Sequence, residues 1–177
     1  KVPPHDIEAE RAVLGSLLLN WGAMGDVIGK LRPERFYSLQ NQVIFEALTE
    51  LFSHNIQGDT LTLVDQLRKN NKLEQAGGTA YIASLTDTVP SSANIEYYAE
   101  IVLDRATRRD LIKISSELKA ESFDLGKEST ALLDTAEQRI FALAERNETT
   151  VIHDARNIMI KEIEIIDARY NSKNEFT

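Results

Sequence analysis

The chain has 177 residues, of which 42% are hydrophobic and 27% charged, so it is close to the globular average and wholesale disorder is excluded. It contains no cysteine, which excludes disulfides, zinc–thiolate sites, iron–sulfur clusters and thiol nucleophiles. Twenty basic residues against twenty-eight acidic ones give a net charge of −8, which argues against broad non-specific binding to DNA phosphate.

The first ninety residues show helical rather than strand periodicity. Asp6 is positioned to cap a first helix, Trp21 to Leu31 resembles a short second one, and Asp59 is positioned to cap a later one. Gly77-Gly78 is expected to stop a helix, because paired glycines end helical segments without any ligand. The sequence therefore predicts a compact bundle of short helices over residues 1–92. The apolar positions that define its faces are Val13, Leu14, Leu17, Leu18, Val43, Ile44, Ala47, Leu48, Leu51, Phe52, Leu63, Val64, Leu67, Tyr81, Ile82 and Leu85.

A long helical hairpin is predicted over residues 93–146. Nothing breaks a helix from Asn94 to Phe123, and its apolar face shifts along the way, which indicates packing first on the bundle and later on another element. Gly126 marks the turn, and Ser129 or Thr130 is a suitable cap for the returning helix. Two long helices joined by a short glycine-containing turn form an antiparallel hairpin.

The returning helix has apolar residues at the 3-4-3 spacing of a short coiled-coil seam, which predicts self-association of the hairpin. These residues are Leu133, Ala136, Ile140 and Leu143. They could equally hold the two helices of one hairpin together. That alternative leaves further apolar residues without an assigned contact, and such a surplus favours contacts between chains. They are Ile101, Leu103, Ile112 and Phe141.

A third, separate helix is predicted beyond the polar break at residues 147–150, within a linker region of residues 147–177. Its apolar arc is wider than the stripe of a helix that lies on its own domain, so we expect it to dock elsewhere. The stripe comprises Ile152, Ala155, Met159, Ile163, Ile166 and Tyr170.

No catalytic, cofactor or metal site is predicted. The three histidines are far apart and lack partners at ligand spacing, and Gly126-Lys127 lacks the glycine and the hydroxyl residue of a phosphate loop. No apolar run approaches the length of a membrane span, and no signal peptide is visible, so we expect a cytoplasmic protein without a membrane partner. Because the sequence does not begin with Met, we expect a piece of a longer chain.

Four basic residues share one broad helical face, at positions 105, 108, 109 and 113. We interpret Arg105, Arg108, Arg109 and Lys113 as a solvated face with local ion pairs. The alternative is a contact with DNA or with an acidic partner.

Five ordered segments resemble the bacterial replicative helicase family DnaB. They read VPPHDIEAERAVLGSLLLN at 2–20, ERFYSLQNQVIFEALTELF at 34–52, GDTLTLVDQLRKNNKLEQAGGTAYIASL at 58–85, NIEYYAEIVLDRATRRDLI at 94–112 and LLDTAEQRIFALAE at 132–145. One departure is Asn41-Gln42, where relatives often carry a His-Arg-like pair. We interpret this pair as part of a surface turn.

The resemblance implies the N-terminal collar domain, the hairpin and the linker helix of a hexameric, ATP-driven helicase that moves 5′ to 3′ at replication forks. It implies that ATP, Mg²⁺ and single-stranded DNA are bound through a motor domain beyond Thr177. It also implies that hairpins pair within a ring and that this ring binds DnaG primase. We expect the C-terminal domain of the primase to bind the hairpin, with Leu111, Ile112 and Phe141 as candidate contact residues. In some relatives a helicase loader engages the same region. The linker helix would then dock on the motor domain of an adjacent subunit.

A second interpretation from a different class is a stand-alone helical adaptor or regulator with a dimerising hairpin and no motor. The residue patterns alone do not separate the two; the family motifs favour the first.

Overall fold

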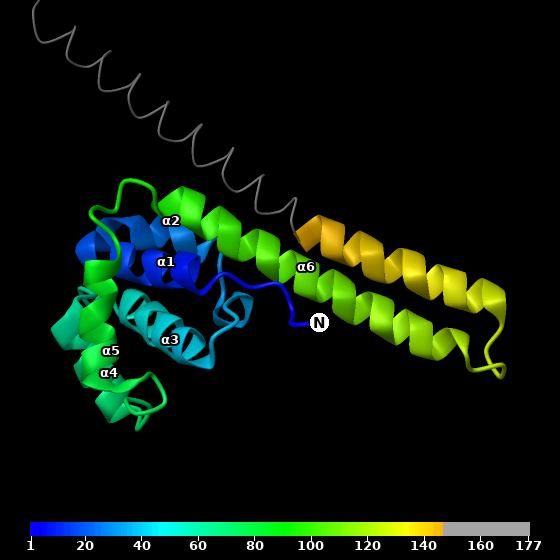
Figure 1. Cartoon of the computed structure of the whole chain (residues 1–177), viewed down its shortest axis with the longest axis horizontal. Helices are drawn as coiled ribbons and strands as arrows, with labels where there is room; N and C mark the ends of the chain where they lie inside the picture. Colours follow the sequence, from blue (N-terminus) through cyan, green and yellow to red (C-terminus); the bar gives the residue numbers. More distant parts are fainter. Residues whose placement is uncertain (147–177) are drawn as a thin grey trace, which may run out of the picture. The chain divides into compact units, whose positions relative to one another are not determined.

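The computed structural model describes residues 1–146 (Figure 1). Throughout this part of the chain the regular elements are helices, so the predicted all-α fold class is confirmed. They are α1 (Ile7–Leu19), η1 (Trp21–Ala23), α2 (Met24–Ile28), η2 (Pro33–Arg35), α3 (Leu39–Ser53), α4 (Thr60–Lys69), α5 (Gly78–Leu85), η3 (Thr86–Thr88) and α6 (Ile95–Ser122), followed by a return helix over residues 129–146. No helix of the described part combines the length and the apolar character that a membrane crossing requires.

Two compact units divide the chain, Lys1–Ser116 and Glu117–Thr177. The first contains the bundle and most of α6. The second begins with the last turns of α6 and continues through the hairpin turn into the return helix. The finer division that the sequence predicts, with boundaries after residues 92 and 146, remains a prediction.

The core of the first unit lies between α1, α3, α4 and α5, where apolar side chains recur every three or four residues. Leu14 and Leu17 of α1, Ile44 of α3, Leu63 of α4 and Ile82 of α5 are completely buried. Burying each such side chain contributes about 1.5–3 kcal/mol. Packing of amphipathic faces therefore stabilises helices that are too short to persist alone.

Close contact between α1 and the end of α5 requires a glycine. A Cβ atom added to Gly15 would lie 2.1 Å from the carbonyl oxygen of Leu85. Because that neighbour is backbone, it cannot move aside in the way a flexible side chain could. Gly15 therefore sets how closely these two segments approach.

Local capping is present where the sequence predicts it. The Asp6 carboxylate accepts a hydrogen bond from the Ala9 amide at 2.9 Å and caps α1. Asp59 and Thr62 form a reciprocal capping box at the start of α4. Each arrangement provides acceptors for N–H groups that the helix itself leaves unpaired.

A short helix lies within the predicted range from Trp21 to Leu31, but the range is not one continuous α-helix. The segment forms the short η1, the five-residue α2 and then a turn. Gly22, Gly25 and Gly29 lie within it, and each glycine costs about 1 kcal/mol relative to alanine in a helix.

Gly77-Gly78 breaks the chain between α4 and α5, as expected, but it closes a helical turn rather than a full helix. Residues 73–77 form turns, in which the Gly77 amide donates to the Glu74 carbonyl at 3.0 Å and the Gly78 amide to the Leu73 carbonyl at 2.9 Å. The pair then leads into α5, with Gly77 at its N-cap. Gly77 and Gly78 have φ angles of +91° and +75°, in the left-handed region that glycine adopts without a steric penalty. The pair is thus a sharp entry into α5.

The first part of α6 packs on the bundle with the face that the sequence predicts. Ile95, Ala99, Val102 and Ala106 are buried, and Tyr98 is half-buried. The helix spans Ile95–Ser122, within one residue of the predicted bounds at each end.

Candidate interaction surface on the helical hairpin

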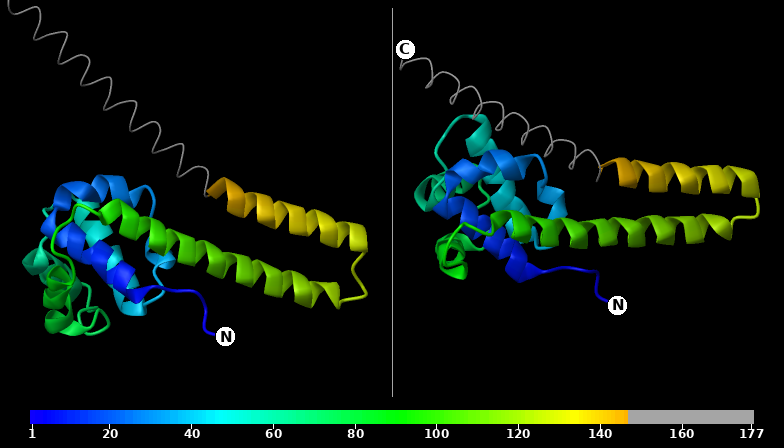
Figure 2. Two further views of the ribbon diagram at one scale, coloured as in Figure 1. Left: turned by 45° about the horizontal axis from the view of Figure 1, so that its top comes forward. Right: turned by 90° about the horizontal axis from the view of Figure 1, so that it is seen from above.

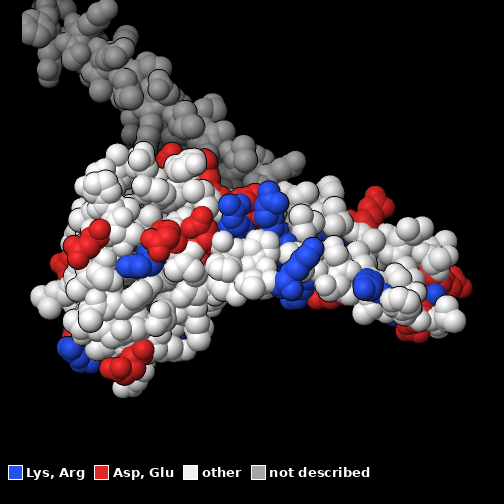
Figure 3. Space-filling view, viewed as in Figure 1, with Lys and Arg blue, Asp and Glu red and all other residues white. Residues whose placement is uncertain are grey.

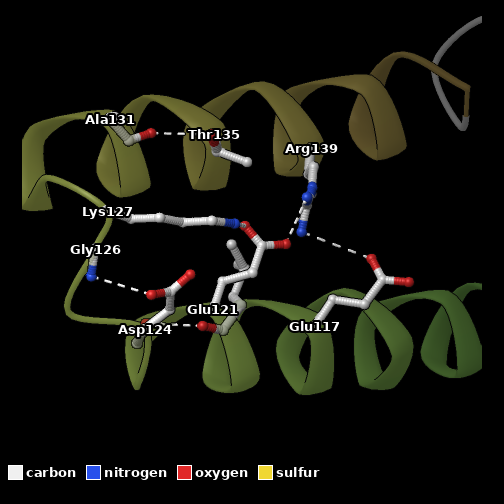
Figure 4. Close-up of polar contacts among 10 residues, drawn as sticks. Glu117, Glu121, Asp124, Gly126, Lys127, Ala131, Thr135 and Arg139 are labelled. Atoms are coloured by element: carbon white, nitrogen blue, oxygen red, sulfur yellow. Dashed lines mark hydrogen bonds and ion pairs between the residues drawn. The ribbon is translucent and has the colours of Figure 1, made fainter.

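The second unit contains an antiparallel turn between the end of α6 and the return helix (Figure 2). The turn covers residues 123–128. Its backbone is held by hydrogen bonds from the Asp124 amide to the Glu121 carbonyl and from the Lys127 amide to the Asp124 carbonyl, both at 3.1 Å. The Asp124 carboxylate also accepts a hydrogen bond from the Gly126 amide at 3.0 Å (Figure 4).

The return helix begins earlier than expected. It includes Ser129 and Thr130, and its first backbone bond runs from the Leu132 amide to the Glu128 carbonyl. Glu128 therefore occupies the N-cap position that we expected Ser129 or Thr130 to fill. An acidic residue at this position interacts favourably with the helix dipole.

An ionic clasp joins the two arms of the hairpin (Figure 4). Arg139 Nη2 donates to Glu121 Oε1 at 2.7 Å, Lys127 Nζ donates to Glu121 Oε2 at 3.1 Å, and Arg139 Nη1 lies 3.6 Å from a carboxylate oxygen of Glu117. The hydrogen bond from Arg139, followed by that from Lys127, holds the pKa of Glu121 below its usual range. We call these four residues the Glu121 clasp.

The predicted seam of the return helix divides into two parts. Leu143 is 4% exposed and Ala136 is half-buried, so these two residues face inward. Leu133 and Ile140 are 70% and 45% exposed and face outward. Seven residues separate the outward pair, which places them about 20° apart on the helix.

The apolar residues assigned to a partner are exposed in part of the set only: Ile101 and Leu103 of α6 instead pack against the core of the first unit, so their assignment to contacts between chains is wrong. Phe141, in the second unit, is 62% exposed, and Leu111 and Ile112 of α6, in the first unit, are 41% and 50% exposed. Large apolar side chains in water favour a contact with another molecule.

The hairpin turn carries two further exposed apolar residues that sequence reasoning did not single out. Phe123 and Leu125 are among the most exposed large hydrophobic side chains of the described residues, with Leu125 at 97%. Their position beside a glycine turn is the sequence signal that could have identified them.

The charge of the hairpin favours a protein partner over a nucleic acid. Residues 117–146 contain seven acidic and four basic residues, a net charge of −3. DNA phosphates would be repelled by such a surface. On the face drawn in Figure 3, basic side chains lie next to acidic ones.

The basic face on α6 is largely engaged within the chain. Arg105 and Arg108 both contact Asp104, and the hydrogen bond from Arg108 is the main reason that the pKa of Asp104 is lowered. Arg109 donates to the carbonyl oxygens of Pro4 at 2.8 Å and Arg35 at 2.6 Å. This arrangement agrees with local pairing rather than with a DNA contact; Lys113, the fourth residue of the face, is exposed.

A buried polar network in the first unit corrects the interpretation of Asn41. This residue is buried in the first turn of α3 rather than placed in a surface turn. Its amide donates to Glu10 at 2.8 Å, and its carbonyl accepts from the Tyr81 hydroxyl at 2.7 Å. Glu10 also accepts hydrogen bonds from the amides of Tyr37 and Ser38.

The predicted docking helix lies outside the described residues. Its stripe of six apolar residues from Ile152 to Tyr170 therefore remains a prediction.

Comparisons with known proteins agree on one family. The family model for the DnaB-like helicase N terminal domain matches residues 2–104. The replicative DNA helicase DnaB of Treponema pallidum is 39% identical over 175 residues, which cover 99% of this chain and 40% of that protein. The chain thus spans about 40% of the length of this curated relative.

Solved structures give the same result. The crystal structure of the N-terminal domain of DnaB helicase from Mycobacterium tuberculosis has a TM-score of 0.74 and 32% identity, covering 80% of this chain and 99% of that one. A DnaB-like replicative helicase, solved in a study of its interactions with primase, shares the fold with a TM-score of 0.66 and 20% identity, covering 86% of this chain and 35% of that one. The chain belongs to the family of DnaB-like helicase N-terminal domains.

Proposed function

We propose that this chain is the assembly and recruitment region of a replicative DNA helicase. It organises subunits into a hexameric ring collar and recruits DnaG primase through the C-terminal domain of that protein. The observation that carries the proposal is the outward set of apolar residues Leu133, Ile140 and Phe141 on an acidic helical hairpin. Family membership and the relative with primase interactions support it.

The activity of the complete protein forms part of the same proposal. ATP and Mg²⁺ would be bound by a RecA-like motor domain encoded beyond Thr177, which would unwind DNA 5′ to 3′ along single-stranded DNA in the cytoplasm. The chain itself would neither hydrolyse ATP nor unwind DNA, because its sequence contains no phosphate loop. Reading the gene past Thr177 tests this: a G-x-x-x-x-G-K-[ST] motif supports the proposal, and a stop codon supports a stand-alone adaptor.

Self-association is tested by Ile140→Asp. Because Ile140 is exposed, the substitution leaves the isolated hairpin intact but places an unpaired charge in the contact between chains. We expect the dissociation constant from sedimentation to rise at least about tenfold, which corresponds to about 1.4 kcal/mol.

Leu61→Asp is the matched control, because Leu61 is an equally apolar, exposed residue on α4 of the first unit. This variant should sediment like the wild type. Equal sedimentation of Ile140→Asp and wild type, with unchanged helicity, would remove the hairpin from the interface.

Primase recruitment is tested with the primase C-terminal domain on a biosensor surface. Phe141→Ala and the double change at Leu111 and Ile112 to Ala should weaken binding, with Leu61→Ala as the control. Truncation of an aromatic anchor commonly costs about 2 kcal/mol or more, which is about thirtyfold in affinity. Unchanged binding by both variants would contradict the assignment to the hairpin.

The region after residue 146 completes the proposal. We propose that the helix expected over residues 154–170 docks on the motor domain of an adjacent subunit and that a helicase loader engages the hairpin or this helix. Hydrogen exchange of amides 158–166 provides the test. They should exchange faster than amides 43–51 in this chain and become protected when the motor domain is restored.

A further inference from the structure

Within the Glu121 clasp, the carboxylate of Glu121 joins three segments of the second unit: the end of α6, the turn and the return helix. One oxygen accepts from Arg139 on the return helix, and the other accepts from Lys127 in the turn (Figure 4). A carboxylate that receives hydrogen bonds from two cations is held in one orientation, and each bond is stronger than a neutral one.

Arg139 also sets the rotation of the return helix. Its guanidinium reaches Glu121 and Glu117, which lie one helical turn apart on the end of α6. Leu133 and Ile140 lie about 120° and 100° from Arg139 around the helix. With Arg139 held inward, both residues remain on the outward side, where they are exposed.

We propose that Glu121 is a positioning residue for the hairpin surface. Its carboxylate locks the rotation of the return helix through Arg139 and Lys127, and thereby keeps Leu133 and Ile140 available to a second copy of the chain. This inference rests on the proposed role of the hairpin in assembly.

Self-association that depends on the clasp should respond to added salt differently from self-association through a purely apolar interface. Salt screens exposed ion pairs, so it weakens the clasp. It does not weaken apolar burial, and it reduces repulsion between two chains of net charge −8. An interface without the clasp should therefore become tighter with added salt. With the clasp, we expect this tightening to be reduced or reversed.

Rotation of the helix can be measured without any self-association. The chain has no cysteine, so single thiols can be introduced as Ile140→Cys and, separately, Ala136→Cys. Labelling by a maleimide should be about fivefold or more faster at the exposed position 140 than at the half-buried position 136. In the Glu121→Gln background the two rates should approach each other, whereas Asp134→Asn, an exposed acid on the same helix, should preserve the ratio.

Sedimentation of the cysteine-free Glu121→Gln chain completes the experiment. We expect association about three- to tenfold weaker than in the wild type, and tightening with salt that exceeds that of Asp134→Asn. An unchanged labelling ratio, or association equal to that of Asp134→Asn, would overturn the positioning role. A wild-type chain that stays monomeric while its labelling ratio still responds to Glu121→Gln would contradict the proposed assembly function and leave the rotational lock intact.

Discussion

Glu10 is a buried carboxylate whose removal should destabilise the first unit more than any surface change on the same helix. It is 2% exposed and accepts hydrogen bonds from the amides of Tyr37 and Ser38 and from the side chain of Asn41. The contacts join α1 to the start of α3, across 27 to 31 residues of sequence.

The expected cost of Glu10→Ala follows from the donors that it leaves behind. Three N–H groups lose their acceptor: the Asn41 side chain is buried, and the bonds from the Tyr37 and Ser38 amides are part-buried. An unpaired buried donor costs about 1–3 kcal/mol, and a donor that water can reach costs less. Removing the desolvated charge returns part of that free energy. We therefore expect a loss of about 3 kcal/mol, a substantial part of the 5–15 kcal/mol that is typical of a domain.

Urea unfolding followed by the fluorescence of Trp21, the single tryptophan, measures this loss. With a slope of about 2 kcal/mol per M, the midpoint should fall by about 1.5 M. Glu8→Ala is the matched control, because Glu8 lies on the same helix with a side chain that is 79% exposed. If both variants unfold within about 0.3 M of each other, the network does not contribute to stability as argued.

Two further predictions concern packing and ionisation. Gly15→Ala should destabilise the first unit by about 3 kcal/mol, because the added Cβ would collide with the Leu85 carbonyl. In the same urea assay Gly29→Ala should be neutral or slightly stabilising, because Gly29 has open space around it. The hydrogen bond from Asn70 lowers the pKa of Glu50. The stabilising contribution of the Glu50 carboxylate is therefore present above its unfolded-state pKa and is lost as pH falls through its folded-state pKa. Glu50→Gln should flatten the acid-side decline in thermal stability, and an unchanged slope would contradict this linkage.

Features that depend on neighbouring residues were predictable from the sequence. The caps by Asp6 and Asp59 and the buried face of α6 follow from local spacing, and the structure confirms them. The segment after Trp21 contains three glycines, and local spacing does not show where such a segment breaks. Local pattern thus predicts most helices but not how a glycine-rich segment divides.

Contacts between distant residues could not be predicted. Nothing in the immediate sequence of Asn41 shows that its side chain bonds to Glu10 and Tyr81 in the folded chain. Likewise, a 3-4-3 pattern does not reveal that Leu143 faces inward while Ile140 faces outward, since both fit one seam. The deciding information lies in partners 18 or more residues away, such as Glu121 for Arg139.

The two carbonyl bonds of Arg109 have a consequence for the order of folding. One connects the middle of α6 with Pro4, 105 residues earlier in the chain, and the other connects it with Arg35, 74 residues earlier. Closing so long a loop carries a large entropic cost, and contacts of this kind form late. We therefore expect the N-terminal arm, residues 1–6, to dock after the helices have packed. Interactions formed after the transition state slow unfolding rather than speed folding, so this guanidinium acts chiefly as a barrier to opening of the arm.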